Sequence, residues 1–383
     1  MTAARTWDAV VVGAGPAGSI VAHGLSRAGA TVLLVDRAAF PRPKVCGCCL
    51  NGRALAALDD SGLSSRLAEL RPHPYDALRL RAWRAEASLS LPGGASVSRE
   101  RFDAMLIEAA AGQGTQLMLG TRATLVGRNA GLSTVALEAP HDAHTTVQCR
   151  VVIVATGLGS PFALRELGGE LVTAGSRLGA STVLASDARV PWLDHTVNMT
   201  VGANGYMGAV RLEDGRWNLA AALDAYAVAR AKGVGPVVRG VLACIPGPLP
   251  AGIDEASWRG TPPLSRHPRH VAADGLFVVG DAAGYVEPFT GEGMACALQG
   301  GRALVPLALR GIEHWQPDLA AAWTRTVRRD VQRRLALSTI AAWGLRRPLI
   351  TTNVTSLLSS WPGLAARPLA WLNRPAAARG AYT

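Results

Sequence analysis

A strand, a glycine-rich turn, a helix and a second strand follow one another over residues 8–36, and no other stretch of the chain restricts the fold as strongly. The β-branched run Val10–Val12 predicts a buried strand. After it, Gly13 permits a tight turn, Gly15 lets the backbone approach a pyrophosphate, and Gly18 lets the helix pack closely on the strand. Phosphates would lie at the helix N-terminus. This order of elements predicts a dinucleotide-binding α/β unit.

Asp36 ends the second strand, where a carboxylate can accept hydrogen bonds from a ribose hydroxyl. An acid at this position argues against a 2′-phosphate, and therefore against NADP in this first site. The chain contains 42 glycines, so the order of the elements carries the prediction rather than the glycines alone. The motif does not separate FAD from NAD.

A second glycine-rich signature lies far along the chain, at residues 275–301. The apolar strand Leu276–Val279 leads into Gly280 and Asp281, and a glycine-flanked turn then opens a helix at about Gly293. Asp281 is therefore expected at the carboxyl edge of a parallel sheet, where open α/β folds bind their ligands. A helix N-terminus preceded by glycines presents unpaired backbone N–H groups, which suit the negative charge of a reduced flavin.

This second signature closely resembles the second FAD motif of the flavoprotein superfamily that contains p-hydroxybenzoate hydroxylase, the tryptophan halogenases and the geranylgeranyl reductases. The resemblance implies that Asp281 binds the ribityl chain of FAD and that the turn Pro288-x-x-Gly291-x-Gly293 lies against the flavin ring. Two distant motifs that agree on one ligand are more specific than either alone. FAD is therefore the expected cofactor.

Three shorter stretches are similar to the same superfamily, so the resemblance covers most of residues 8–310. Residues 42–47 resemble the Lys-x-Cys-Gly loop of the geranylgeranyl reductase branch, which approaches the flavin ring. Residues 99–106 resemble that branch's Arg-x-x-Phe-Asp-x-x-Leu helix, whose arginine approaches the cofactor, and residues 151–157 resemble the strand that closes the FAD domain. The residues expected to contact FAD are Gly13, Gly15, Pro16, Ala17, Gly18, Asp36, Arg37, Lys44, Cys46, Gly47, Arg99, Ala155, Gly157, Gly280, Asp281, Pro288, Gly291, Gly293 and Met294.

The predicted fold class is α/β: a Rossmann-like FAD-binding domain (GR2 type), interleaved with an antiparallel-sheet substrate domain and followed by C-terminal helices. The FAD-binding domain is assigned to residues 1–71, 97–160 and 268–315, the substrate domain to 72–96 and 161–267, and the helical region to 316–383. Loose alternation over 77–91 predicts a hairpin, and the strand-like runs between 176 and 223 predict further strands that would cover the flavin.

The formal net charge of +11 lies mainly in residues 301–383, which hold twelve arginines against three acidic residues. Without interleaved aromatic residues or a known binding module, this excess does not indicate nucleic acid. It predicts a solvated helical face or contact with anionic lipid. The tryptophan-rich part of the same region predicts either a helical cap on the core or a lipophilic patch at a membrane surface.

The chain is expected to be cytoplasmic, with membrane association left open, because no apolar run reaches the roughly 18 residues that span a bilayer. Its six cysteines lack the spacing of a secreted disulfide framework, which favours a reducing compartment. Although Cys48 and Cys49 are adjacent, no paired Cys or His cluster completes a metal site in the sequence, so no metal is predicted.

Flavin performs much of its chemistry itself, and the sequence therefore leaves the reaction open between double-bond reduction and hydroxylation of a hydrophobic molecule such as a polyketide, a quinone or an isoprenoid. The alternatives are a monooxygenase that acts on an aromatic substrate and an electron-transfer flavoprotein that reduces a quinone. The Trp-x-Trp-x-Ile-Pro motif of halogenases is absent. Without a second dinucleotide fingerprint, electrons are expected from transiently bound NAD(P)H, a flavin reductase or a ferredoxin-like donor.

Few side chains are candidates for catalysis. Cys46 lies in the loop that the resemblance places near the flavin ring, and Glu292 follows the ring-contacting glycine, where a carboxylate could relay protons. Tyr206 matches the tyrosine of the isoprenoid reductase motif Tyr-x-Trp-x-Phe-Pro, although the rest of that motif is absent here. A lone histidine between strands, such as His195, is usually structural.

Overall fold

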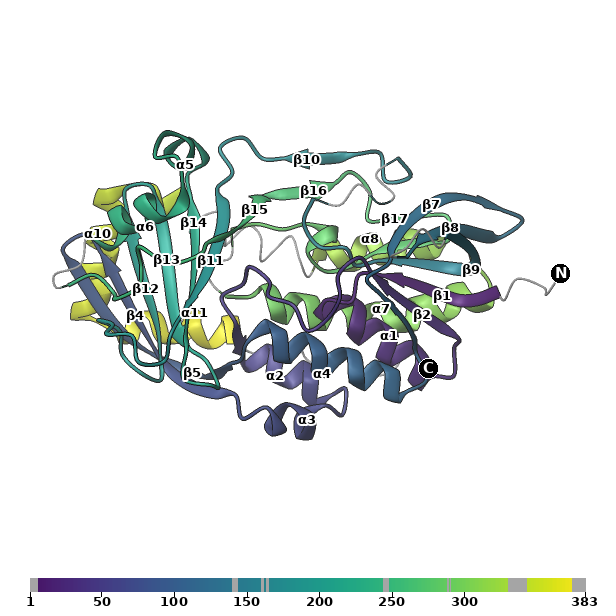
Figure 1. Cartoon of the computed structure of the whole chain (residues 1–383), viewed down its shortest axis with the longest axis horizontal. Helices are drawn as coiled ribbons and strands as arrows, with labels where there is room; N and C mark the ends of the chain where they lie inside the picture. The colour runs from purple at the N-terminus through teal and green to yellow at the C-terminus, as the bar shows by residue number, and fades with distance from the viewer. Residues whose placement is uncertain are drawn as a thin grey trace.

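A computed structural model of the chain describes residues 6–139, 144–159, 162, 165–243, 248–287, 289, 291–329 and 343–373. Figure 1 shows two halves, each built around its own β-sheet. Within the described residues, no helix is long and apolar enough to cross a membrane.

The first half contains a mainly parallel sheet formed by segments from both ends of the chain. Its strand order is β17-β18-β9-β1-β2-β6, and β1 lies parallel to both β2 and β9. The bounds are β1 (Thr6–Val12), β2 (Val32–Asp36), β6 (Gln116–Leu119), β9 (His144–Val154), β17 (Ala272–Ala273) and β18 (Leu276–Val278). β7 (Arg122–Asn129) and β8 (Leu132–Glu138) add an antiparallel extension to β9 that the sequence analysis did not predict. The strand–turn–helix reading of residues 8–36 is confirmed.

Three helices pack beside this sheet: α1 (Pro16–Arg27), α4 (Arg99–Gly112) and α7 (Gly293–Glu313). α7 begins at the glycine expected from the sequence. Between β18 and α7, a short 3₁₀ turn, η1 (Gly280–Ala283), carries Asp281. Two further helices, α2 (Gly52–Asp59) and α3 (Ser64–Glu69), follow the cysteine-containing loop.

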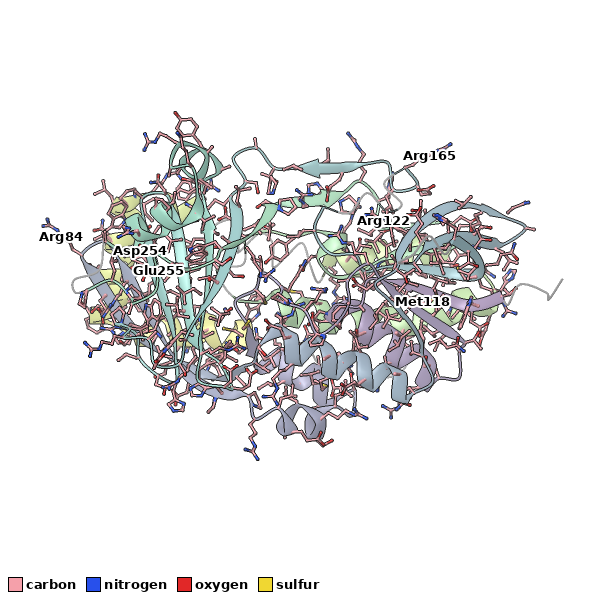
Figure 2. All side chains as sticks on the ribbon, viewed as in Figure 1. Arg84, Met118, Arg122, Arg165, Asp254 and Glu255 are labelled. Atoms are coloured by element: carbon pink, nitrogen blue, oxygen red, sulfur yellow. The ribbon has the colours of Figure 1, made fainter. Side chains whose placement is uncertain are left out.

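The second half contains an eight-stranded sheet with the order β15-β11-β14-β13-β12-β4-β5-β3. Its strands are β3 (Cys49–Asn51), β4 (His73–Ala82), β5 (Ala85–Ser96), β11 (Leu178–Leu184), β12 (Thr196–Gly202), β13 (Gly205–Arg211), β14 (Trp217–Leu223) and β15 (Arg259–Pro263). The predicted hairpin is β4–β5, and Arg84 in its turn projects into solvent at the end of the molecule far from the first sheet (Figure 2). β10 (Glu170–Val172) and β16 (Arg266–Pro268) form a separate two-stranded pair.

One detail of this second sheet differs from the expectation of a purely antiparallel sheet: β12 runs parallel to β4. The two strands belong to separate excursions of the chain, so no tight turn joins them and no hairpin fixes their relative direction. The fold class itself, with its interleaved sheets and C-terminal helices, is confirmed. The exact domain boundaries stay a prediction.

Helices also pack against the substrate sheet. α5 (Ala225–Arg230) and α6 (Val234–Leu242) follow β14, and α6 contacts β12, β13 and β14. α10 (Pro348–Ser360) packs on β4 and β5, and α11 (Gly363–Asn373) packs on β5 (Figure 1).

α8 (Pro317–Val327) fixes the strand that leads to Asp281. The Trp323 side chain is 2% exposed, packs edge-on against Phe277 and donates a hydrogen bond from Nε1 to the carbonyl oxygen of Val278 at 2.8 Å. Trp323 shares the buried face of α8 with Leu319 and Val327.

We expect Trp323→Ala to lower the free energy of unfolding by about 3–5 kcal/mol, because it leaves a large cavity under β18 and removes a buried hydrogen bond. Urea denaturation followed by circular dichroism would measure this change. Trp361→Ala is the matched control: that tryptophan is 67% exposed, so its loss should change stability by less than about 0.5 kcal/mol. Equal effects of the two substitutions would contradict the packing described.

Candidate flavin site

The glycine-rich turn is shaped by backbone contacts that exclude side chains. Gly13 has a φ of +109°, and a Cβ there would lie 2.3 Å from the carbonyl oxygen of Ala155. A Cβ on Gly18 would lie 1.8 Å from the carbonyl oxygen of Gly13. By contrast, a Cβ on Gly15 would meet no atom within 4 Å. The turn is thus tightly packed beneath and open above, as required for a pyrophosphate at the N-terminus of α1.

Asp36 holds this turn through its own carboxylate. One oxygen accepts the backbone N–H of Ala14 and the other accepts that of Ala38, both at 2.8 Å. Because each carboxylate oxygen has a further lone pair, the group can still accept a ribose hydroxyl. Arg37 follows directly in the chain, and Arg42 approaches the Asp36 carboxylate to 3.9 Å. The role of Asp36 and Arg37 toward FAD stays a prediction.

Asp281 and Lys44 lie close enough for their charges to interact, although they are far apart in sequence. Burial raises the pKa of the Asp281 carboxyl to about 6, while the nearby cations Lys44 and Arg99 act in the opposite direction. Burial, together with Arg42 and Arg99, lowers the pKa of the Lys44 ammonium. Lys44 Nζ also lies 4.0 Å from the position that a Cβ on Gly157 would take. Loops after β2, β9 and β18 therefore meet here.

The cysteine loop adds an acidic thiol to this group. The Cys48 thiol hydrogen bonds to Cys46, and this bond together with the Arg99 guanidinium lowers the pKa of Cys46 to about 5, although burial opposes the change. The backbone N–H of Cys48 donates to Cys46 Sγ at 3.3 Å. Asp103 holds Arg99 in place through two bonds of 2.8 and 2.9 Å. At neutral pH, Cys46 is consequently a thiolate that can accept hydrogen bonds.

The start of α7 is held by an ion pair. Glu292 is buried, and its carboxylate lies 2.7 Å from Arg53 Nη1 of α2. Gly291 before it has a φ of +68°, a conformation that favours glycine, and Met294 after it is buried. The ion pair gives Glu292 a structural partner, and the proton relay stays a prediction. Pro288 lies outside the described residues.

Tyr206 of β13 lies on the face of the substrate sheet that is turned toward Tyr285 and Phe289 of the second FAD motif. Its side chain is 4% exposed, its ring meets Phe289 edge-on at 5.2 Å, and its hydroxyl has no hydrogen-bond partner within the described residues. Burial raises the pKa of this hydroxyl, which therefore stays protonated. Apolar residues surround it: Leu80, Ala82, Met199, Val201, Ala222, Leu264 and Leu345.

A buried charge cluster that sequence analysis missed lies beside Tyr206. Arg177 is 1% exposed, lies 5.5 Å from the Tyr206 ring centroid, and pairs with Glu287 at 3.4 Å and with Asp224 at 3.1 Å. Glu287 also pairs with Arg346 at 2.8 Å. These partners are 47 to 110 residues apart, so no local pattern could have revealed the cluster.

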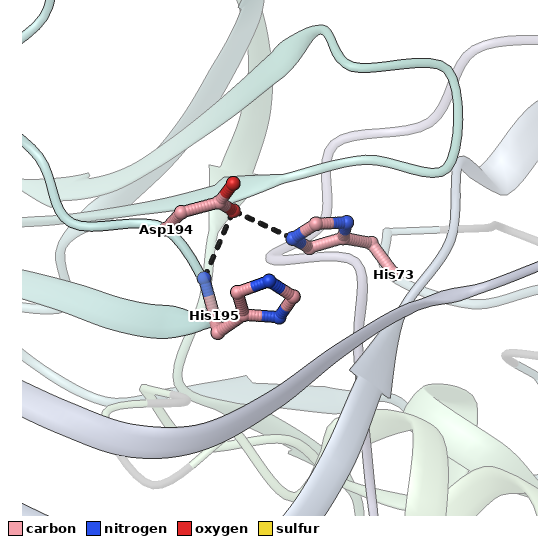
Figure 3. A group of neighbouring side chains, drawn as sticks. All are labelled: His73, Asp194 and His195. Atoms are coloured by element: carbon pink, nitrogen blue, oxygen red, sulfur yellow. Dashed lines mark hydrogen bonds and ion pairs between the residues drawn. The ribbon is translucent and has the colours of Figure 1, made fainter.

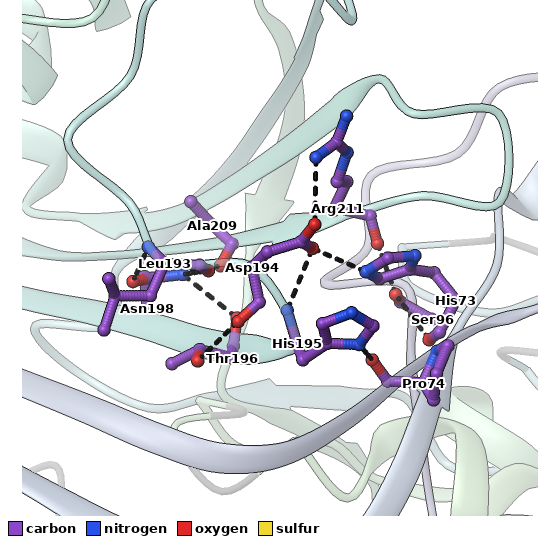
Figure 4. Close-up of polar contacts among 10 residues, drawn as sticks. All are labelled: His73, Pro74, Ser96, Leu193, Asp194, His195, Thr196, Asn198, Ala209 and Arg211. Carbon is purple, nitrogen blue, oxygen red and sulfur yellow. Dashed lines mark hydrogen bonds and ion pairs between the residues drawn. The ribbon is translucent and has the colours of Figure 1, made fainter.

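His195 belongs to a different cluster, just before β12 (Figure 3). Its ring stacks on His73 with centroids 4.7 Å apart, and its Nδ1 lies 3.0 Å from the Pro74 carbonyl oxygen. Asp194 joins His73 at 2.6 Å and Arg211 at 2.9 Å (Figure 4). These bonds tie β4, β12 and β13 together. The ligand atoms of His73, Asp194 and His195 lie within 4.8 Å of one another, a proximity that the sequence analysis did not predict.

Comparison with known proteins decides the family. Residues 6–222 match the family described as FAD binding domain. The menaquinone reductase of Mycobacterium tuberculosis (strain H37Rv) is 32% identical over 364 residues, which cover 86% of this chain and 83% of the relative. This chain belongs to the FAD-binding domain family. It is an FAD-dependent oxidoreductase, and the predicted cofactor is confirmed.

Other relatives fit the same picture. Digeranylgeranylglycerophospholipid reductase 1 of Methanopyrus kandleri is 26% identical over 83% of this flavoprotein and 84% of its own length. A geranylgeranyl bacteriochlorophyll reductase-like structure from Thermoplasma acidophilum superposes with a TM-score of 0.76 over 96% of this chain and 99% of its own, at 17% identity. The resemblance to the geranylgeranyl reductase branch is therefore confirmed, and the structural likeness confirms the fold.

The site fits FAD on the observations above: the space over Gly15 is open, and the half-buried carboxyl of Asp281 suits hydroxyl donors. We expect Asp281→Ala to weaken FAD binding about 10- to 100-fold, because each hydrogen bond to a charged group is worth about 1.5–3 kcal/mol. Titration of FAD-free protein by flavin fluorescence would measure this. Asp274→Ala, which removes an exposed carboxylate after β17, is the control and should leave the affinity unchanged. Unaltered binding by Asp281→Ala would refute its assignment.

Thiol reactivity tests the cysteine loop. Iodoacetamide should alkylate Cys46 of FAD-free protein at close to its maximal rate at pH 7, since thiolate is the reactive form. The rate should fall as the pH is lowered, with a midpoint near pH 5. Cys49, whose pKa burial raises to about 12, should react far more slowly. Peptide mass spectrometry would separate the two sites. Arg99→Gln should shift the Cys46 midpoint upward, and a midpoint that stays above pH 8 in the parent protein would contradict the described electrostatics.

Proposed function

We propose that this flavoprotein reduces carbon–carbon double bonds in the isoprenoid chain of a lipid, such as a prenylated quinone. The observation that carries the proposal is similarity along most of the chain to proteins named as reductases of a menaquinone and of digeranylgeranylglycerophospholipid. Both named substrates carry isoprenoid chains. The residues around Tyr206 support the same class, because they are apolar and buried, as the surroundings of a hydrocarbon chain would be.

Bound and reduced, FAD supplies the hydride equivalent for such a reduction. The Tyr206 hydroxyl is the better proton donor among the candidate side chains, because its raised pKa keeps it protonated and no described group competes for it. Cys46, as a thiolate, would not donate a proton. It would accept a hydrogen bond and so fix the position of the group that donates it. Arg177 and Glu287 would hold the Tyr206 ring from one side.

The electron donor and the site of action belong to the same proposal. NAD(P)H that binds transiently, or an external flavin reductase or ferredoxin-like protein, would reduce the cofactor. The substrate would come from a membrane, which the protein would contact peripherally through its C-terminal region.

We expect the reduced holoenzyme under argon to convert a menaquinone or a geranylgeranyl lipid in detergent into a product that is heavier by two hydrogens. Mass spectrometry of the extracted lipid measures this, and parallel reactions with NADH, NADPH and dithionite compare the donors. A product that gains one oxygen only in air would indicate hydroxylation and overturn the proposal.

Tyr206→Phe should lower kcat for that reduction by about 10²- to 10⁴-fold, the usual contribution of a positioned acid, while FAD content stays unchanged. Tyr226→Phe, at an exposed position on α5, is the control. Stopped-flow oxidation of the reduced flavin by the substrate would provide the rate. If Tyr206→Phe reduces the substrate at the parental rate, the hydroxyl is not the proton donor.

A further inference from the structure

α10 exposes several large apolar side chains although two of its threonines are buried. Thr351 and Thr355 are buried, whereas Leu349, Val354 and Leu357 are 79%, 47% and 50% exposed. A helix whose outer side meets only water carries mainly polar side chains there. An exposed surface of this kind marks a contact with another apolar phase.

Large apolar side chains are also exposed on both sides of α10. Three tryptophans are more than half exposed: Trp343 before the helix, Trp361 after it and Trp371 on α11. A surface hollow of about 630 Å³ on α11 is lined by Ala366, Arg367, Pro368, Ala370 and Trp371. We define the α10–α11 surface by its exposed apolar residues: Trp343, Leu349, Ile350, Val354, Leu357, Trp361, Leu364 and Trp371.

The charged residues within the segment that forms this surface all have one sign. Residues 343–373 contain no Asp or Glu, but they contain Arg346, Arg347 and Arg367. The guanidinium of Arg347 lies 3.7 Å from the centroid of the Trp343 ring. Tryptophan and arginine beside aliphatic side chains are the composition of helices that lie in the interface of an anionic membrane. A second copy of this cationic surface would be repelled, so self-association explains the composition less well.

The α10–α11 surface is also joined to the substrate side of the flavin site. Leu345 packs in the apolar cluster that contains Tyr206, and Arg346 pairs with Glu287, the partner of Arg177. At the other end, Asn373 Oδ1 accepts the backbone N–H of Gly52 at 3.4 Å, directly after β3 of the cysteine loop. Both ends of the helical pair are therefore fixed to elements that form the site.

We propose that the α10–α11 surface docks on an anionic lipid bilayer, with its apolar side chains among the acyl chains and its arginines at the headgroups. The helices have 13 and 11 residues, so they would lie in the interface rather than span it. Delivery of an isoprenoid lipid from the bilayer toward Tyr206 rests on the proposed function, whereas the docking itself does not.

Flotation of the FAD-loaded protein with vesicles tests the docking. The vesicles contain phosphatidylcholine with roughly 30% phosphatidylglycerol, an anionic lipid that attracts basic segments. They should carry the protein to the top of a gradient, whereas vesicles of pure phosphatidylcholine should carry much less. The triple variant Leu349→Ser, Leu357→Ser, Trp361→Ser should lose at least about tenfold in partitioning. Arg347→Gln with Arg367→Gln should reduce the preference for phosphatidylglycerol.

Tyr226→Ser is the matched control, since it removes an equally exposed apolar side chain from α5 and should leave flotation unchanged. FAD content and thermal unfolding of every variant confirm folding. Absence of flotation by the parent protein, or full flotation by the triple variant, overturns the proposal. A dimer in light scattering that the triple variant dissociates would also overturn it, because the surface would then bind a second copy.

Activity on detergent-dispersed substrate separates this proposal from the proposed function. The triple variant should keep that activity while losing activity on substrate held in vesicles. Flotation without reductase activity would contradict the proposed function alone.

Discussion

The parallel pairing of β18 with β9, and of β9 with β1, is the constraint on which the site depends. Because parallel strands end at the same edge of a sheet, three segments separated by more than a hundred residues deliver their loops to one place. Gly13 packs against Ala155 there, and Asp281 follows β18 at the same edge. Trp323 then fixes β18 from the other side through the Val278 carbonyl.

At this edge of the first sheet, charged side chains lie next to partners of opposite charge, because a charge that is buried alone costs free energy. Arg99 is compensated by Asp103 and by the Cys46 thiolate, and the Asp281 carboxyl faces Lys44. A buried charge is tolerated when it is paired. Removal of one partner leaves the other charge buried without compensation, which destabilises the protein. The same reasoning applies to Arg177 and Glu287 on the substrate side.

Local sequence patterns predicted the parts of the fold that depend on short-range geometry. The glycine turn, the strand before Asp281, the start of α7 and the β4–β5 hairpin each follow from residues within one element or turn. The parallel pairing of β12 with β4 and the pair Arg177–Glu287 depend on which distant segments meet, and no periodicity encodes that. The exposure of Leu349, Val354 and Leu357 on α10 was not predicted either, because Leu, Val and Thr alternate there without a clear apolar face.

The attachment of the cysteine loop to the substrate sheet has a mechanical consequence. The Asn218 side chain of β14 donates to the Cys46 carbonyl oxygen at 3.0 Å, and the loop continues directly into β3 at the edge of the same sheet. A shift of β14 relative to the first sheet would therefore pull on the loop and change the hydrogen bonds around the Cys46 sulfur. The hydrogen bonds around Cys46 are thereby coupled to the position of a strand in the other half of the molecule.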